Sequence, residues 1–371
     1  MTDLFQPEIP LTDDAKNSPL PSLRPLPCDA WIASSTVHKA IRRGDFETAE
    51  RAILTLIRHR GTGVFRRLMV IAFEDIGIGA PDLLVTLTRL CTDARLRRQH
   101  GDTPTVARWM VRAMAAAPKE RSSDYLICSA VHRPDWECHR ETVGALSIRD
   151  RITVATDDDA PLALRATASW FASGVEAGTE KRIGGGDLIG LMTAYIDAGL
   201  PEATGLAIQA AARATREPIV LMLPPLLQEL RRSRSEPTSR SVPVPPTLFV
   251  NGVPTYALDK HTRAGRQAIV TFARENQDVR SALERHVPEF RHRDAAYLAA
   301  FYTDAMPVTH RFEWDQVDEL ETLGRETDLL WAGIPATGMA DILAAFQSNL
   351  DHLNEVRAGI LGSSSDKGNA R

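Results

Sequence analysis

The chain has 371 residues, a formal net charge of −4 and a hydrophobic content of 43%, which is ordinary for a folded protein and long enough for two or three domains. Its four cysteines form no CxxC pair, which argues against a secreted disulfide framework or a common zinc signature. The acidic, proline-containing start MTDLFQPEIPLTDD does not have the pattern of a signal peptide, and no apolar run approaches the ~20 residues that span a bilayer. We therefore expect a cytoplasmic protein with reduced thiols and no membrane contact.

The charge is unevenly distributed along the chain. Residues 34–124 contain 16 Lys/Arg against 10 Asp/Glu, so this stretch is basic although the whole chain is acidic. Before it, six prolines between positions 7 and 27 oppose both helix and internal strand. We expect a disordered N-terminal tail over 1–30 and a local basic surface in the segment that follows.

Apolar residues recur at helical spacing through most of the chain. In the first part they predict helices beginning near 34, and over 46–60, 64–76, 81–98, 105–117 and 118–131. A short irregular stretch is expected at 132–142, followed by helices over 161–175, 187–198, 201–214 and 218–232. This pattern divides the region into a helical domain over 31–140 and a second helical segment over 141–232.

The segment SRSEPTSRSVPVPP, residues 233–246, is polar, rich in proline and without periodicity, which is typical of a linker. After it, Asn251-Gly252 stands between two apolar runs, the strongest short-range signal for a β-hairpin. Helices are then predicted over 260–276, 278–286, 294–303, 314–323 and 340–353. We expect a C-terminal helical domain with one β-hairpin over 247–355 and a disordered tail over 356–371.

The stretch RRLMVIAFEDIGIGAPDL, residues 66–83, has charged ends and an apolar middle. Arg67 lies seven and eight residues before Glu74 and Asp75, so these charges share roughly one helix face but are too distant for a direct pair. The two acids are at a helix C-terminus, where the helix dipole disfavours them, so we expect each to have a cationic partner on a neighbouring helix. Arg66, Arg67, Glu74, Asp75 and Gly77 are therefore interpreted as a structural clasp rather than as catalytic groups.

Residues 34–83, together with TVARWMVRAMAAAPKERSSDYL further on, resemble the C-terminal region of the replication-associated recombination protein A family, which includes Werner-helicase-interacting protein. The matching positions occur in order over about 90 residues, a quarter of the chain. They are His38, Lys39, Ile41, Arg42, Gly44-Asp45, Arg66-Arg67-Leu68, Glu74-Asp75-Ile76-Gly77, Pro81 and Ala117-Pro118-Lys119.

The resemblance implies an all-helical collar that assembles homotetramers beside a clamp-loader-like ATPase at stalled replication forks. This chain departs from the family in one decisive respect, because no GxxxxGK[ST] phosphate-binding loop occurs in it. Only assembly and partner binding are therefore carried over from the family. The fold class expected is mainly α, with a multi-helix bundle like a clamp-loader collar plus a further helical domain that carries the hairpin.

Three groups of basic residues are candidates for contact with nucleic acid, since clustered arginine and lysine neutralise phosphates without sequence preference. One is near the first predicted helix, one ends the helix over 81–98, and one begins the helix after residue 260, where cations oppose the helix dipole. The groups are Lys39, Arg42 and Arg43; Arg95, Arg97 and Arg98; and His261, Arg263 and Arg266. Solvated helix faces are the alternative for the first two groups, and the third indicates an anionic partner or nucleic acid.

Two other patterns are better explained without a ligand. Gly184-Gly185-Gly186-Asp187 has neither the preceding strand nor the GxGxxG spacing of a dinucleotide site, which favours a capped turn. Cys128, His132, Cys138 and His139 are close in sequence, but their spacing is not a common zinc pattern. No metal, cofactor or catalytic set is predicted.

The sequence therefore predicts a non-catalytic assembly or adaptor protein in DNA replication, recombination or repair. It would form a homo-oligomer or bind a related ATPase, with single-stranded or forked DNA as a further candidate partner. Two alternatives stay open: an enzyme with a centre near His261, Arg263 and Arg266, and a helical interaction protein unrelated to DNA.

Overall fold

A computed structural model describes residues 22–177 and 183–368. In these ranges the protein is mainly α-helical, as the sequence predicts, and it has two small two-stranded antiparallel sheets where one hairpin was predicted. The helices before the predicted linker are α2 (Ala30–Arg42), α3 (Phe46–Arg60), α4 (Val64–Ile71), α5 (Pro81–Thr92), α6 (Ala94–His100), α7 (Thr103–Ala116), α8 (Ser122–His132), α9 (Glu137–Ala145), α10 (Ile148–Thr156), α11 (Leu162–Ser173), α12 (Leu188–Asp197), α13 (Glu202–Thr215) and α14 (Leu223–Arg231).

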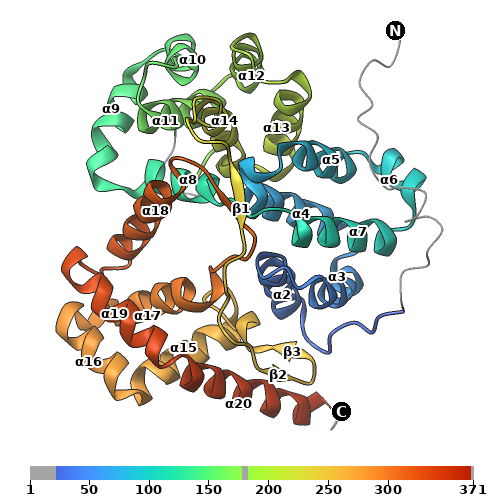
Figure 1. The fold of residues 1–371 in the computed structure, drawn as a ribbon, viewed down its shortest axis with the longest axis vertical. Helices are drawn as coiled ribbons and strands as arrows, with labels where there is room; N and C mark the ends of the chain where they lie inside the picture. The colour runs from blue at the N-terminus through green and yellow to red at the C-terminus, as the bar shows by residue number, and fades with distance from the viewer. Residues whose placement is uncertain (1–21, 178–182, 369–371) are drawn as a thin grey trace.

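The second half contains the strands β1 (Thr238–Arg240), β2 (Phe249–Val250), β3 (Val253–Pro254) and β4 (Arg311–Glu313) and the helices α15 (Arg263–Glu275), α16 (Gln277–His286), α17 (His292–Ala300), α18 (Val317–Trp331), α19 (Ala336–Ser348) and α20 (Leu350–Gly368). Figure 1 shows α9–α14 at one end of the molecule and α15–α17, α19 and α20 at the other, with α2 and α3 between them and α18 packed beside α8. The helix pair α2 and α3 thus lies where the two halves of the chain meet.

Two hydrophobic cores support this arrangement. The large core contains most buried residues of α2–α14, together with Tyr256, Phe301 and Trp314 from the second half of the chain. The small core is formed within the second half, where Phe272 and Phe346 pack edge to face at 5.6 Å. Because side chains from both halves share the large core, the helices around α2 are packed against the start of the predicted C-terminal domain.

The predicted hairpin is confirmed. β2 and β3 pair antiparallel, Val250 opposite Val253, around Asn251 and Gly252. Both turn residues have positive φ, +54° and +79°, which is the backbone of a type I′ turn and the reason that Asn-Gly is favoured there.

Several predicted boundaries need correction. The segment 132–142 is not irregular: it contains most of α9, and α10 follows where no helix was predicted. The predicted linker contributes β1, whose Ser239 pairs with Phe312 of β4. The predicted C-terminal tail is helical as far as Gly368, because Arg357 and Leu361 of α20 are buried against the rest of the protein.

The predicted N-terminal tail falls partly outside the described residues, since 1–21 are not described. Residues 22–29 lie against the protein: Leu26 is buried, and its carbonyl accepts a hydrogen bond from the Thr55 hydroxyl of α3. Asp29 then caps α2 by accepting hydrogen bonds from the amides of Trp31 and Ile32.

No single helix in the described ranges is long and apolar enough to cross a membrane. The bent pair α18 and α19 meets that requirement together, by length and composition only, with an angle of 95° between the two helices.

The clasp segment ends in an unusual way. After α4 the chain makes one π-helical turn, Ala72–Ile76, and then reverses at Gly77, whose φ is +49°. A Cβ on Gly77 would lie 2.8 Å from the Glu120 carbonyl oxygen and 2.9 Å from its Oε2 atom. The glycine is therefore required both by the backbone conformation and by the close approach of the segment before α8.

Gly61 offers a matched control for this position. Its φ and ψ of +52° and −130° resemble the +49° and −135° of Gly77, but a Cβ there would meet nothing within 4 Å. We predict that Gly77→Ala lowers the free energy of unfolding by about 2 kcal/mol more than Gly61→Ala, because only the first adds overpacking to the backbone strain. Urea unfolding of the two variants measures this difference, and equal losses would contradict the role given to the Glu120 contact.

Candidate functional site

The basic residues of α2 are buried. The exposed fractions of Lys39 and Arg42 are 2% and 1%, and His38 is buried beside them. His38 and Arg42 are four residues apart, so they lie on one face of α2, and Lys39 and Arg43 lie next to them on the following face. Burying cations costs free energy unless each has an anionic partner. We therefore take these two adjacent faces of α2, together with the acids that neutralise them, as the candidate functional site.

Arg42 binds both acids of the clasp segment. Its Nε atom donates to the two carboxylate oxygens of Asp75 at 2.9 and 3.1 Å, and its Nη2 atom donates to Glu74 Oε1 at 2.7 Å. Arg121, the N-cap residue of α8, also donates to Asp75 Oδ1 and pairs with Asp124. Three helical segments that are distant in sequence are thus joined through one buried carboxylate.

The charges of this cluster set the ionisation of Asp75. Burial by itself would raise the pKa of the carboxyl, but the charges of Arg42 and Arg121 and a hydrogen bond from His38 hold it well below its usual range. The carboxylate is therefore ionised throughout the neutral range. Its charge is matched by the guanidinium groups that surround it.

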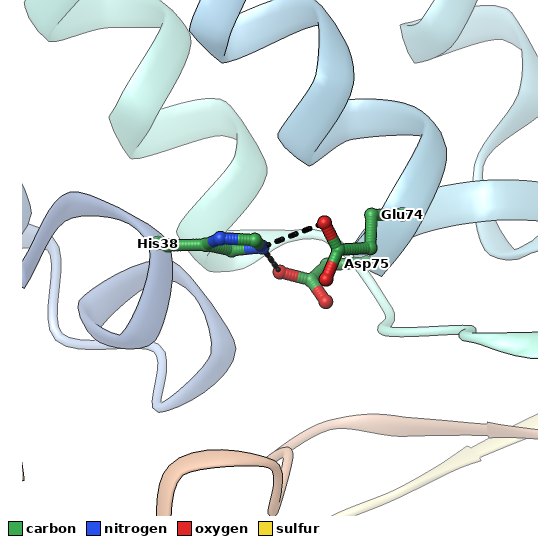
Figure 2. A group of neighbouring side chains, drawn as sticks. All are labelled: His38, Glu74 and Asp75. Carbon is green, nitrogen blue, oxygen red and sulfur yellow. Dashed lines mark ion pairs between the residues drawn. The ribbon is translucent and has the colours of Figure 1, made fainter. Parts of the chain in front are cut away.

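His38 completes the cluster as a neutral ring. Burial lowers the pKa of His38 to about 4. Arg67 Nη2 lies 2.9 Å from Nδ1, and Nε2 lies 2.8 Å from Asp75 Oδ2 and 3.1 Å from Arg42 Nη2, so both ring nitrogens contact charged groups of the cluster. Figure 2 shows the ring directed at both Asp75 and Glu74.

The same three side chains could geometrically hold a metal ion. Ligand atoms of His38, Glu74 and Asp75 all lie within 4.8 Å of one another (Figure 2). The carboxylate oxygens, however, already accept from Arg42 and Arg121. A cation would have to be placed against two guanidinium groups, so the arrangement favours an ion-pair network over a metal centre.

The adjacent face of α2 is paired with the second half of the chain. Lys39 Nζ lies 2.5 Å from Asp259 Oδ2 and donates to the Ser35 hydroxyl at 3.0 Å. Arg43 donates to Asp304 at 2.7 Å, and its guanidinium lies over the Tyr256 ring at 4.5 Å. These contacts attach α2 to the segment after the hairpin and to a second π-helical turn, Phe301–Ala305.

Asp304 also receives a cation from the last helix. Arg357 of α20 donates to Asp304 Oδ2 at 2.5 Å, and both side chains are buried. Arg42 donates to the Ala305 carbonyl at 3.0 Å, and its guanidinium lies 5.6 Å from the Phe301 ring. α2 is thus bound to both π-helical turns and, through Asp304, to α20.

These positions correct one group of predicted nucleic-acid residues. Lys39, Arg42 and Arg43 are held in internal ion pairs and are not available to phosphate groups at the surface. The two acids of the predicted clasp do have cationic partners, and these are supplied by Arg42 and Arg121 of other helices.

The two arginines of the predicted clasp do not bind the acids directly. Arg67 contacts the acids only through His38, as described above, and Arg66 donates to the carbonyl of Thr215 at the end of α13. Gly77 has the structural role described under the fold. The clasp thus extends to three neighbouring helices, α2, α8 and α13.

The other two candidate groups lie at the surface. On α6, Arg95 and Arg98 are exposed, whereas Arg97 donates to the carbonyls of Leu90 and Cys91 and packs over the ring of Phe65. α6 packs on α5 and α7.

The third group is exposed at the start of α15, where His261 precedes the helix and Arg263 and Arg266 are in its first turn. α15 packs on α16, α17 and α20, whereas α6 packs on α5 and α7, so the two exposed basic groups lie on helices with different neighbours. The His261 ring lies edge-on to the Phe301 ring at 6.1 Å, and this contact does not supply a catalytic partner.

The glycine cluster before Asp187 and the cysteine and histidine group have ordinary structural contacts. Asp187 caps α12 by accepting a hydrogen bond from the Gly190 amide, as a capped turn requires. Cys138 is exposed, Cys128 is partly buried on α8, and the His132 ring packs against Trp331 at 5.6 Å. Among the described residues, these cysteines and histidines form no group with the spacing of metal ligands.

The sequence did not indicate five further charged residues of this network. Asp259 and Asp304 neutralise Lys39 and Arg43, and Arg121, Asp124 and Arg357 form ion pairs with other members of the network. Arg121 follows the Ala-Pro-Lys motif by two positions, so its place in the resembling segment was an available signal. Asp304, for example, lies 261 residues from Arg43 along the chain, and such a pairing has no local signature.

Comparison with known proteins does not identify the chain: no family model, no curated protein and no solved structure matches it.

Asp75 is the centre of the network, and Asp135 provides a control with the same chemistry at the surface. Asp135 is 65% exposed in its side chain and pairs with Arg133 at 2.9 Å. We predict that Asp75→Asn lowers the free energy of unfolding by about 3 to 5 kcal/mol, because Arg42 and Arg121 lose their shared buried carboxylate. Asp135→Asn should cost less than about 1 kcal/mol. Urea unfolding at pH 7 gives both values, and a loss below 1 kcal/mol for Asp75→Asn would contradict the assignment.

Proposed function

We propose that this protein is a non-catalytic assembly or adaptor factor in DNA replication, recombination or repair. Its helices α2–α8, which cover the segment resembling the recombination protein A collar, would self-associate or bind a related ATPase. The DNA context of this proposal comes from the sequence resemblance, which is the only feature that points to a process.

The non-catalytic part of the proposal rests on one observation: the motif charges of the resembling segment are paired inside the protein. His38, Lys39, Arg42, Glu74 and Asp75 are the chemically most active residues of the resembling segment, and all are engaged in internal pairs that hold helices together. Groups committed in this way are not free to bind or activate a substrate. The sequence also contains no phosphate-binding loop, so ATP hydrolysis would have to come from a partner.

Fewer of the candidate nucleic-acid-binding residues are exposed at the surface than the sequence suggested. Arg95 and Arg98 remain exposed on α6, next to the helices of the resembling segment. Arg263 and Arg266 are a second exposed pair on α15. We place the principal DNA contact on α6, because it belongs to the same bundle as the proposed assembly surface.

Two measurements on the purified full chain test this proposal. Light scattering is expected to show a discrete oligomer, alone or with a collar-bearing ATPase. Anisotropy of labelled forked DNA, titrated at several salt concentrations, is expected to show binding that falls steeply with salt. A monomer that does not bind DNA even at low salt would contradict the proposal.

Paired variants localise the DNA contact. The double variant Arg95→Gln/Arg98→Gln should weaken binding and reduce the slope of log affinity against log salt by roughly 2, one for each lost phosphate contact. Arg274→Gln/Arg280→Gln removes the same charge from exposed positions at the C-terminus of α15 and the first turn of α16, and it should leave the slope unchanged. Equal effects of the two double variants would show that α6 is not the contact.

A further inference from the structure

A cavity of about 390 Å³ lies between the two halves of the chain. Its walls come from the start of α8, from the π-helical turn Phe301–Ala305 and the residues after it, and from α18 and α19, while Val242 from the connection between β1 and β2 lies on one side. This volume is within the range of small-molecule sites, which often form where two parts of a fold meet. The cavity is separate from the Asp75 cluster, although Arg121 borders both.

Most of the lining is apolar or aromatic. Tyr125 of α8 and Met306 face each other across one wall, with the Tyr125 hydroxyl 3.6 Å from the Met306 sulfur. Val308, Val317 and Leu343 provide aliphatic surface. Such a lining accommodates the apolar body of a ligand and contributes little to the binding of a freely soluble polar ion.

The charged groups of the lining are mostly positive. Four cations, Lys119, Arg121, Arg311 and Arg325, border the cavity together with two acids, Glu120 and Glu321. The charge of Arg121 is matched by Asp75 and Asp124, and that of Arg311 by Asp318 and Glu321. The acid Glu120 accepts hydrogen bonds from the amide and hydroxyl of Ser122 and from the Trp314 indole, so the two remaining cations, Lys119 and Arg325, determine which ligand the cavity favours.

Neither of these cations is neutralised by a described acid. Lys119 donates from Nζ to the backbone carbonyls of Ala115 and Ala117 and has no ion pair within the described ranges. Arg325, on α18, likewise forms no ion pair with any described residue, and it is partly exposed. A guanidinium can bind a carboxylate through two parallel hydrogen bonds, so Arg325 is suited to an anionic end group.

We propose that this cavity binds a small amphipathic carboxylate, with the apolar body between Tyr125, Met306 and Leu343 and the carboxylate at Arg325. The apolar walls account for the body and the unpaired cation for the charge. This proposal does not depend on a role in DNA metabolism: Arg325, Met306 and Leu343 lie outside helices α2–α8, and Tyr125 of α8 is not among the residues assigned to DNA contact.

Decanoate is a suitable probe, with 1-decanol as the uncharged analogue and acetate as the end group without the body. Isothermal titration of the full chain is expected to show saturable decanoate binding with a stoichiometry near one. Decanol and acetate should each bind at least tenfold more weakly, because each lacks one half of the recognition. No decanoate binding, or equal binding of decanol, would overturn the proposal.

Three variants locate the binding. Arg325→Gln should weaken decanoate at least tenfold, and Ala344→Trp, which places a large ring at an exposed position of the cavity wall, should abolish binding while the fold is retained by circular dichroism. Arg274→Gln, an exposed arginine outside the cavity lining, should leave the affinity unchanged. Decanoate binding that is unaffected by both cavity variants would place the ligand elsewhere and overturn the assignment.

Discussion

The structure depends on the neutralisation of one helix face. A buried guanidinium that loses its acid costs several kcal/mol, so the interior position of Arg42 requires a carboxylate to be held against it. Asp75 supplies that carboxylate, and its position in turn requires the π-helical turn after α4, the sharp reversal at Gly77 and the close approach of the segment before α8. The conspicuous end of the clasp segment is thus explained by packing around a charge.

The same constraint extends into the second half of the chain. The side chains of Lys39 on α2 and of Arg43, the C-cap of α2, are also buried, and they pair with Asp259 and Asp304. Asp304 is itself within a π-helical turn, so two such turns present acids to one helix. π-helical turns are uncommon and occur often at functional positions. Here their shared feature is that they bring carboxylates to α2, which joins the helical bundle to the C-terminal region.

Local signals in the sequence predicted local structure well. Apolar spacing predicted a largely helical chain, and Asn251-Gly252 predicted the hairpin, because both depend on interactions within a few residues. The charges of α2 were misinterpreted for the opposite reason: clustered basic residues have the same sequence pattern whether they face phosphates or buried acids far along the chain. The clasp was predicted in outline because the helix dipole argument required cations for Glu74 and Asp75, but the sequence did not identify Arg42 and Arg121 as those cations.

The structure of the C-terminal tail also depends on tertiary contacts that the sequence does not reveal. GSSSDKGNAR has the composition of a disordered segment, and the helix nevertheless continues to Gly368 because Arg357 and Leu361, just before these residues, are fixed by tertiary contacts. The cavity bordered by Tyr125, Val242 and Leu343 could not be predicted either, since its walls come together only when the two halves of the chain pack.

We infer that α2 couples the two halves of the chain into one cooperative unit. Native-state hydrogen exchange, followed by mass spectrometry over increasing denaturant, tests it directly by comparing amides of α2 with amides of Phe301–Ala305 and of residues 350–361 of α20. The account predicts that these three segments lose protection in a single unfolding event with the same free energy. Exchange of Phe301–Ala305 and α20 through a smaller opening that leaves α2 protected would contradict it.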